Sequence, residues 1–136
     1  MIQNRRKYHN VPDNRHVNGV NIRFDSTMEA RRYDELMLLL ISKKIRNLQL
    51  QPEYTLIGAF RTPYGEDVKA IRYRADFRYE VPVREQVRND DGTVEWLERW
   101  ETVVEDVKTD GTRTAEYKMK RKLLLSQGIV ITEVQA

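Results

Sequence analysis

The sequence predicts a single domain of mixed structure, an α/β (α+β) fold in which helices flank a mixed sheet and the elements follow the order αβββαβ. Three observations favour this fold. Apolar residues recur at helical spacing after Ser26 and again after Thr114, apolar and polar residues alternate over residues 69–83, and turn-forming residues separate these stretches. A chain of 136 residues with 40% hydrophobic content can support one modest core.

The first strong element is a helix expected over about residues 27–44. Ser26 precedes it and Glu29 follows three residues later, which is the capping-box pattern of an N-cap hydroxyl with a carboxylate at the third helical position. We assign this helix to a domain spanning residues 21–136. Residues 1–20 are rich in Asn, Arg and His with few apolar anchors, so we expect them to form a basic, weakly ordered arm.

Three strands are expected after this helix. The first lies within residues 49–60, after Pro52, and the second covers residues 69–83. Turn residues at 89–92 then lead into a long returning strand over about residues 93–108. We expect the second and third strands to form a protruding β-hairpin, with acidic residues near and after its tip.

A second helix and a final strand complete the order. Thr114 can cap a helix over about residues 115–126, and Gly128 would close it. The apolar run that opens residues 129–134 is typical of a strand beside a core. If this strand lies parallel to the one over residues 93–108, the helix between them forms a right-handed crossover.

The composition excludes several kinds of site. The chain has no cysteine, which rules out disulfides and cysteine-based zinc sites and is compatible with a reducing cytosol. It has no apolar run of eighteen residues, and its N-terminus lacks the apolar segment of a signal peptide, so we expect a cytoplasmic protein with no membrane partner. His9 and His16 have no further ligands nearby in sequence and do not indicate a metal site.

The net charge is only +3, but the charges are unevenly distributed. Positive charges gather in residues 1–16 and 108–122, and negative charges gather in residues 84–106. Such segregation is typical of a nucleic-acid binder. It is equally compatible with an ordinary protein whose charged faces are solvated.

Two aspartates and a lysine carry the most informative chemistry. Asp76 lies on the polar face of the second expected strand, and Asp106 and Lys108 end the third. Residues two apart in a strand share a face, so Asp106 and Lys108 point together and Glu105 points the other way. If Asp76 and Asp106 lie level, they repel each other unless a cation sits between them, and Mg²⁺ prefers such oxygen ligands. The alternative is a solvated polar face with a weak ion pair.

The order of these motifs resembles that of the PD-(D/E)XK nuclease superfamily, and more closely that of phage-associated proteins in its Holliday-junction-resolvase-like branch. The matching stretches span most of the chain. They are residues 24–33 (FDSTMEARRY), 50–52 (LQP), 73–77 (YRADF), 104–108 (VEDVK) and 116–118 (EYK). One departure is that Ala75, rather than proline, precedes Asp76.

The resemblance implies a restriction-endonuclease-like core and a phage-encoded, metal-dependent DNA endonuclease that hydrolyses phosphodiester bonds with Mg²⁺ or Mn²⁺, with branched DNA as the implied substrate. By the same resemblance, Asp76 is the metal-bridging aspartate, Asp106 the second acidic ligand and Lys108 the motif lysine. Glu29 corresponds to the first-helix glutamate, a direct or water-mediated ligand. Its other interpretation is the capping box with Ser26, and a single carboxylate cannot fill both roles at once.

Several further residues are candidates for contacts to DNA, each with an alternative as an ordinary polar or solvated side chain. They are Gln51, Lys118, Lys122, Arg5, Arg6 and Lys7. Trp96 and Trp100 share one face of the long strand and would form core, a homodimer contact or a stacking platform. Two hypotheses of other classes stay open: a non-catalytic DNA-binding module on a nuclease-like fold, and a phage accessory protein that uses its hairpin for protein contacts.

Overall fold

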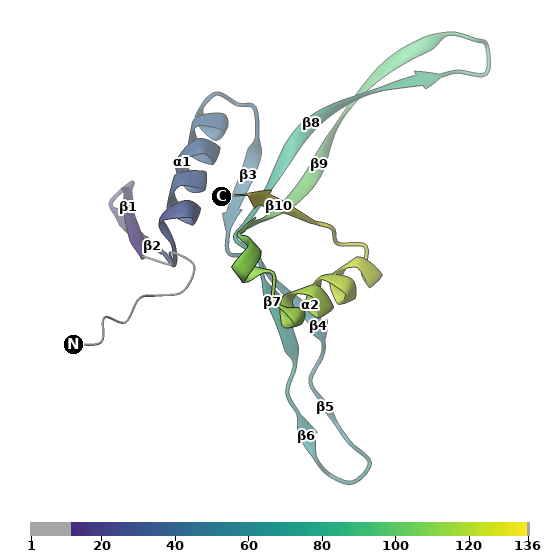
Figure 1. The fold of residues 1–136 in the computed structure, drawn as a ribbon. Coiled ribbons are helices and arrows are strands. Elements are labelled where there is room, and N and C mark those ends of the chain that lie inside the picture. The colour runs from purple at the N-terminus through teal and green to yellow at the C-terminus, as the bar shows by residue number, and fades with distance from the viewer. Residues whose placement is uncertain (1–11, 136) are drawn as a thin grey trace.

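The computed structural model describes residues 12–135 and has mixed α and β structure, which confirms the predicted class (Figure 1). Its central feature is a mixed sheet of four strands in the order β10-β9-β8-β3. Strand β10 runs parallel to β9, whereas β9–β8 and β8–β3 are antiparallel pairs. The bounds are β3 Arg46–Leu50, β8 Phe77–Arg88, β9 Val94–Lys108 and β10 Ile131–Gln135.

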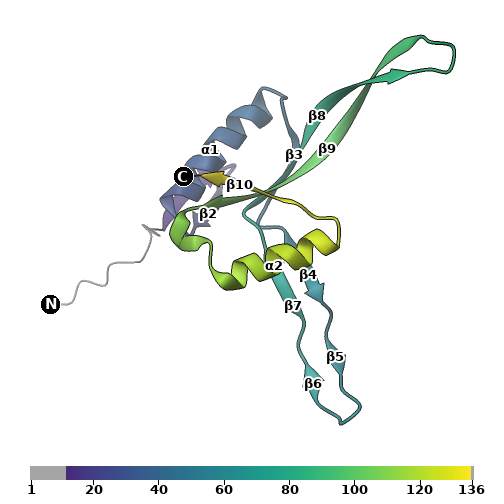
Figure 2. The same ribbon diagram turned by 45° about the vertical axis from the view of Figure 1, so that its right-hand side comes forward.

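The two helices cover opposite faces of this sheet (Figure 2). Helix α1 (Thr27–Ile41) packs through Tyr33 and Leu36 in one core cluster, to which β8 contributes Phe77. Helix α2 (Ala115–Ser126) packs through Tyr117 and Leu124 in a second cluster. Successive residues of β9 belong to different clusters, since Val103 packs with the first and Val104 with the second. This is the period of two that a sheet buried on both faces requires.

Both helices begin where the sequence predicts. The hydroxyl of Ser26 accepts a hydrogen bond from the Glu29 backbone N–H at 3.1 Å, and the hydroxyl of Thr114 accepts one from Tyr117 N–H at 3.1 Å. Helix α1 ends at Ile41, earlier than the expected residue 44, because Lys43 adopts a left-handed backbone with φ 62° that cannot continue a helix.

Strands β9 and β10 pair in parallel, which meets the condition for a crossover through the helix between them. The chain leaves β9 through a short 3-10 turn at Asp110–Thr112, passes along α2 and returns as β10 (Figure 1). In the resulting register Glu133 lies opposite Asp106. This crossover therefore brings a residue of the final strand next to a predicted site residue.

The strand expected after Pro52 is present over Glu53–Ile57, but it is preceded by β3, which the sequence did not suggest, with a bend at Gln51-Pro52 between them. The second expected strand divides at Ala75-Asp76, which corrects the prediction of one continuous strand over residues 69–83. Gln51 has a left-handed φ of 50°, and Pro52 has no N–H to continue a ladder, so the chain bends there. Hydrogen bonds from Gln51 N–H to the Asp76 carbonyl (2.9 Å) and from Ala75 N–H to the Pro52 carbonyl (3.0 Å) hold the two bends together.

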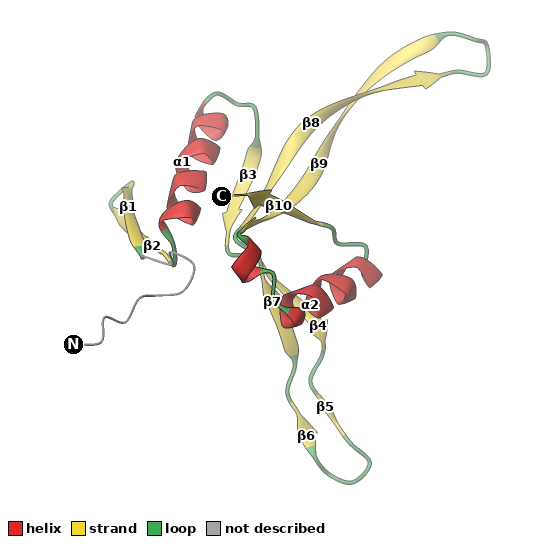
Figure 3. Cartoon of the chain, viewed as in Figure 1, coloured by secondary structure: helices red, strands yellow, loops and turns green. Residues whose placement is uncertain are grey.

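Beyond these bends the chain forms a second two-stranded ribbon that the sequence did not suggest. Strand β4 (Glu53–Ile57) pairs with β7 (Ile71–Arg74), and the short strands β5 (Phe60–Arg61) and β6 (Asp67–Val68) extend the same ribbon. Figure 3 shows this ribbon and the β8–β9 hairpin leaving the body in different directions. The molecule therefore has two protrusions.

Residues 13–20 differ from the expectation of a weakly ordered arm over residues 1–20. Strands β1 (Asp13–Val17) and β2 (Val20–Phe24) form a hairpin. Arg15 fixes this hairpin to α1, because its Nε and Nη2 donate to the two carboxylate oxygens of Asp34, each at 2.8 Å. Residues 1–11, with Arg5, Arg6, Lys7 and His9, lie outside the described residues.

The β8–β9 hairpin pairs from Phe77 opposite Glu105 out to Arg88 opposite Val94. Its tryptophans are exposed, Trp96 by 56% and Trp100 by 40%, so neither forms core in this chain. Arginine side chains lie over both rings. The guanidinium carbon of Arg46 is 4.0 Å from the Trp100 ring centroid, and that of Arg84 is 5.0 Å from the Trp96 centroid.

Candidate active site

Asp76, at the bend just before β8, lies level with Asp106 on β9. The β8–β9 register ends at Phe77 opposite Glu105, and one residue further along the chain Asp76 lies opposite Asp106. Each carboxylate accepts a hydrogen bond from the other strand: Asp106 Oδ1 from Asp76 N–H at 2.8 Å, and Asp76 Oδ2 from Val107 N–H at 2.7 Å. These bonds use one oxygen of each aspartate and hold the two side chains beside each other.

The second oxygen of Asp106 is the least satisfied polar atom of this region. The residue is only 2% exposed, and its Oδ2 has no hydrogen-bond partner within residues 12–135. Burial raises the pKa of Asp106, and the Glu133 charge on β10 raises it further, while Lys108 and the Asp76 N–H oppose the increase. A buried carboxylate oxygen without a partner is costly unless a proton or a cation satisfies it.

The ionised form of Asp76 is also disfavoured by its surroundings. Burial raises the pKa of Asp76 to about 6, even though the hydrogen bond from Val107 and the charge of Lys108 both favour the ionised form. The desolvation of this carboxylate therefore outweighs the groups that stabilise it. Near neutral pH, the two neighbouring aspartates together favour a positive charge close by.

Glu29 lies in the same electrostatic environment. Burial raises the pKa of Glu29 to about 7, with further increases from the charges of Asp76, Asp25 and Asp106 and an opposing effect of Lys108. Only half of the capping box is present. The Glu29 N–H is capped by Ser26, but its carboxylate forms no hydrogen bond to Ser26 or to any other group in residues 12–135. The side chain is therefore available for a role beside the aspartates.

Lys108 lies on the same face of β9 as Asp106. Its Nζ is 4.1 Å from the centroid of the Tyr117 ring on α2, while Val107 packs toward α1. The Tyr117 hydroxyl donates to Glu133 Oε1 at 2.8 Å, and Arg113 Nε donates to Glu133 Oε2 at 2.8 Å. These contacts hold the ring that supports the ammonium group next to the carboxylates.

Glu105 lies on the opposite face, as strand alternation predicts. It is 0% exposed, and Arg32 on α1 donates to both of its oxygens, from Nε to Oε1 and from Nη2 to Oε2, the latter at 3.0 Å. The Tyr79 hydroxyl adds a hydrogen bond at 2.6 Å. Glu105 is thus a partnered structural carboxylate that joins α1 to the sheet, and it is separated from the Asp106 face.

The candidate DNA contacts are placed unequally. Gln51 is half-buried and touches the site through its backbone, by the bond from its N–H to the Asp76 carbonyl. Lys118 and Lys122 are exposed on α2. The structure instead brings Lys120, together with Arg72 and Arg74, into a groove with Lys108. Sequence patterns gave no signal for this set, because it depends on β7 lying alongside α2.

The residues present suit a hard cation by their chemistry. Three carboxylates lie together, each with a raised pKa, and Asp106 Oδ2 is buried without a partner. Oxygen ligands of this kind are those that Mg²⁺ and Mn²⁺ prefer. As the side chains stand, however, no group of three or more His, Cys, Asp or Glu residues within 12–135 has an arrangement ready to hold a metal. Metal binding would thus require a local side-chain adjustment.

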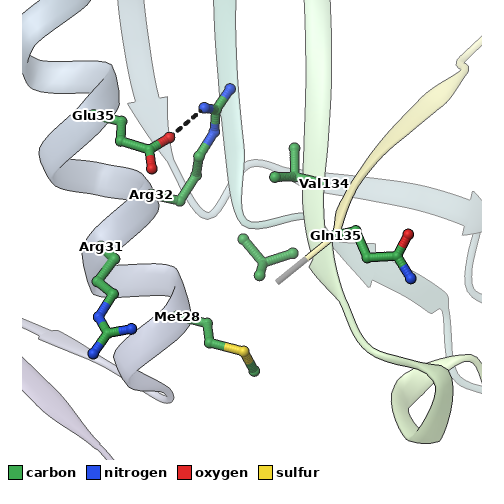
Figure 4. A pocket seen from close by; sticks show the side chains of 7 residues that line it. Met28, Arg31, Arg32, Glu35, Val134 and Gln135 are labelled. Atoms are coloured by element: carbon green, nitrogen blue, oxygen red, sulfur yellow. Dashed lines mark hydrogen bonds and ion pairs between the residues drawn. The ribbon is translucent and has the colours of Figure 1, made fainter.

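A separate pocket of about 350 Å³ lies between α1 and β10 (Figure 4). Its lining residues come from α1, β9 and β10. They are Met28, Arg31, Arg32, Glu35, Val107, Val134 and Gln135. None of the predicted site residues lines this pocket, and Val107 marks it as belonging to the α1 face of β9.

Comparison with known protein families assigns the chain to one family. A family model described as a protein of unknown function, DUF1064, matches residues 5–134. The chain belongs to this family. No curated protein and no solved structure gives a significant match. The DUF1064 description states no activity, so the function of this family member has to be argued from its site. Neither helix in residues 12–135 has the length and apolar character needed to cross a membrane.

The raised pKa values predict how the stability of this DUF1064 protein depends on pH. Folded-state pKa values of about 6 for Asp76 and about 7 for Glu29 lie above the usual values, so the folded state binds protons that the unfolded chain has released. We therefore expect stability to fall as the pH rises from 5 to 8, by on the order of 2 kcal/mol once solvent screening is allowed for.

Thermal unfolding in a chelator at several pH values would measure this. The double variant Glu29→Gln with Asp76→Asn should flatten the profile over the same range. Added Mg²⁺ should raise the Tm more at pH 8 than at pH 5, because the ionised carboxylates bind it. A profile that stays the same in the double variant would show that other groups govern the pH dependence.

Proposed function

We propose that this protein is a metal-dependent DNA endonuclease that hydrolyses phosphodiester bonds with Mg²⁺ or Mn²⁺. The observation that carries the proposal is the level pair of half-buried Asp76 and buried Asp106, in which Asp106 has an oxygen without a partner. Lys108 on the same face and Glu29 beside them complete a set of groups suited to a phosphodiester.

The order of elements supports a restriction-endonuclease-like core as part of the proposal. A capped helix precedes the antiparallel strands β8 and β9, with Asp76 directly before β8 and Asp106 on β9, and a second helix leads to a parallel edge strand. This agrees with the PD-(D/E)XK resemblance of the motifs. The phage-type, resolvase-like character, with branched DNA as substrate and two copies acting as a symmetric pair, rests on that resemblance alone.

The metal would be held by Asp76 and Asp106, with Glu29 as a third or water-mediated ligand. When bound, it would polarise the phosphate and lower the pKa of a coordinated water. The hydrogen bonds from Asp76 N–H and Val107 N–H hold one oxygen of each aspartate in place. The other oxygen of each stays available, and this is what the chain itself contributes to binding.

Lys108 would stabilise the negative charge that develops on the phosphate during the reaction. Its Nζ lies over the Tyr117 ring, so the ammonium group is positioned before substrate arrives. Burial raises the pKa of Glu29 to about 7 in the absence of metal, and a cation held beside it would favour its ionised, ligating form.

A cleavage assay tests the proposal directly. The protein would be incubated with a four-way junction, a linear duplex and a single strand of DNA, in Mg²⁺, Mn²⁺ or a chelator. We expect cleavage that requires metal, and a loss of about 10²–10³-fold in rate for Lys108→Met, because one electrostatic contact to the transition state is removed. Lys44→Met changes the same residue type at the exposed turn after α1 and should leave the rate near that of the wild type.

Equal rates for Lys108→Met and the wild type would contradict the site assignment. Absence of cleavage with every DNA and every metal would contradict the nuclease proposal. The rates on the junction and on the linear duplex decide the branched-DNA part separately.

A second function, a non-catalytic DNA-binding module, is favoured by one observation. Within residues 12–135 no three ligating side chains are arranged for a metal. Such a module would bind DNA in a chelator with strong salt dependence and would cleave no substrate. The same assay, run beside a binding titration, separates the two functions.

A further inference from the structure

A positively charged groove runs beside the candidate active site. It has a volume of about 330 Å³ and lies between β7 and the N-terminal half of α2. Within the described residues β7 pairs only with β4, so its other edge is free to border this groove. Four cationic side chains line it. They are Arg72, Arg74, Lys108 and Lys120.

The charges of this groove are only partly neutralised. Among the side chains that the structure describes, Glu116 is the one carboxylate in its lining, and it pairs with Lys120 at 3.0 Å in an i,i+4 contact. Arg72 has a longer contact to Glu53 at 3.6 Å, and Arg74 one to Asp25 at 3.9 Å. Both of these contacts join exposed side chains, and exposed ion pairs of this kind contribute little and exchange readily for a stronger anion.

The floor of the groove is aromatic and firmly held. Tyr73 of β7 and Tyr117 of α2 are both buried, with ring centroids 6.2 Å apart. The Tyr117 hydroxyl is bonded to Glu133, and the Tyr117 ring carries the ammonium group of Lys108. The groove therefore presents cations above buried tyrosine rings, and Lys108 belongs both to the groove and to the face that carries Asp106.

We propose that this groove binds the phosphodiester backbone of DNA, on the stretch of strand adjoining the phosphate held at the candidate active site. The inference rests on the proposed function, since it names the path of the substrate from that site. The inference is supported by charge complementarity, because the described lining holds four cations, Lys108 among them, and one carboxylate that is already paired. The cations follow β7 and the inner side of α2, whereas Lys118 and Lys122 do not line the groove.

Binding in a chelator tests this without cleavage. Fluorescently labelled DNA, as a single strand and as a duplex, and an RNA of the same sequence would be titrated with the wild type over a series of salt concentrations. The double variant Arg72→Gln with Lys120→Gln removes two groove charges. The double variant Lys43→Gln with Lys44→Gln removes two exposed charges at the turn after α1, outside the groove, and is the matched control.

The groove variant is expected to bind DNA about tenfold more weakly at low salt, and its slope of log affinity against log salt should be smaller by about 1.8 for the duplex or about 1.4 for the single strand. The control should stay within about twofold of the wild type. If the groove variant loses affinity for DNA but not for RNA, the groove is selective for DNA. If it loses affinity for both, the groove accepts either backbone. Both results support backbone binding.

Equal losses in the two double variants would overturn the inference, because net charge alone would then explain binding. Absence of DNA binding by the wild type would overturn it as well. Failure here is distinct from failure of the nuclease proposal. If the wild type cleaves DNA but the groove variant binds as well as the control, only the groove inference is contradicted. If binding changes as expected but no DNA is cleaved, only the nuclease proposal is contradicted.

Discussion

Arg32→Met is expected to lower the free energy of unfolding by about 3–5 kcal/mol, because it leaves a buried carboxylate without its countercharge. Glu105 is 0% exposed and depends on Arg32, which donates to both of its oxygens, and on the Tyr79 hydroxyl. Burial, together with the neighbouring Glu105 carboxylate, raises the pKa of Tyr79 to about 12, so the phenol remains a donor at neutral pH. A single phenolic hydrogen bond cannot stabilise the charge by itself.

Two further variants isolate the buried pair. Glu35→Gln removes the exposed partner of Arg32. Because the Glu35 side chain is 63% exposed, this change should lower the free energy of unfolding by less than about 1 kcal/mol. The double variant Arg32→Met with Glu105→Met should recover part of the loss, since no uncompensated charge remains. Denaturant unfolding in a chelator measures all three. If Arg32→Met costs no more than Glu35→Gln, the buried pair has no structural role.

The Arg32–Glu105 pair also connects the two parts of the candidate site. Arg32 lies one turn after Glu29 on α1, and Glu105 directly precedes Asp106 on β9. The pair therefore fixes the helix that carries one candidate ligand against the strand that carries another. The pair lies on the opposite face of the sheet, so it affects the site only by positioning the helix and the strand that carry the candidate ligands.

Asp76→Asn is expected to abolish cleavage while making the metal-free protein more stable. The loss of activity should reach about 10³-fold, because a carboxylate that holds the metal is replaced by a neutral amide. Stability at pH 8 in a chelator should rise by about 1–2 kcal/mol, because the substitution removes an anion that burial already disfavours. The asparagine carbonyl can still accept the Val107 N–H.

The opposite direction of the two effects separates a functional carboxylate from a structural one. Cleavage rate and denaturant unfolding would be measured on the same preparation. Asp90→Asn, at the exposed turn of the β8–β9 hairpin, is the matched control and should change neither quantity. Retained activity in Asp76→Asn, or a stability loss comparable to that of a core substitution, would contradict the assignment.

Local sequence signals predicted the helices and the strand faces well. Ser26 and Thr114 cap helices at the expected residues, because a cap depends on groups only three residues apart. Alternation along β9 separated Asp106 from Glu105 correctly, because the period of two is a property of the strand itself. The proposed roles of these residues still await the assays above.

The divided strands show where local signals end. Gln51 adopts a left-handed backbone that nothing in its residue type requires, and the bend is held by bonds to residues 75 and 76 across the sheet. The β4–β7 ribbon follows from that bend. Pairing at such separation depends on register and burial, which alternation and turn residues do not specify.

The sequence by itself determined the element types, the face on which Asp106 and Lys108 lie, and the identity of the acidic candidates. Only the tertiary structure decided that Asp76 lies level with Asp106 and that Glu29 shares their desolvated environment. It also decided that Arg32 neutralises Glu105 and that Arg72 and Lys120 line one groove. The physical reason is that caps and alternation arise from neighbours in the chain, whereas burial and charge coupling arise from residues that only folding brings together.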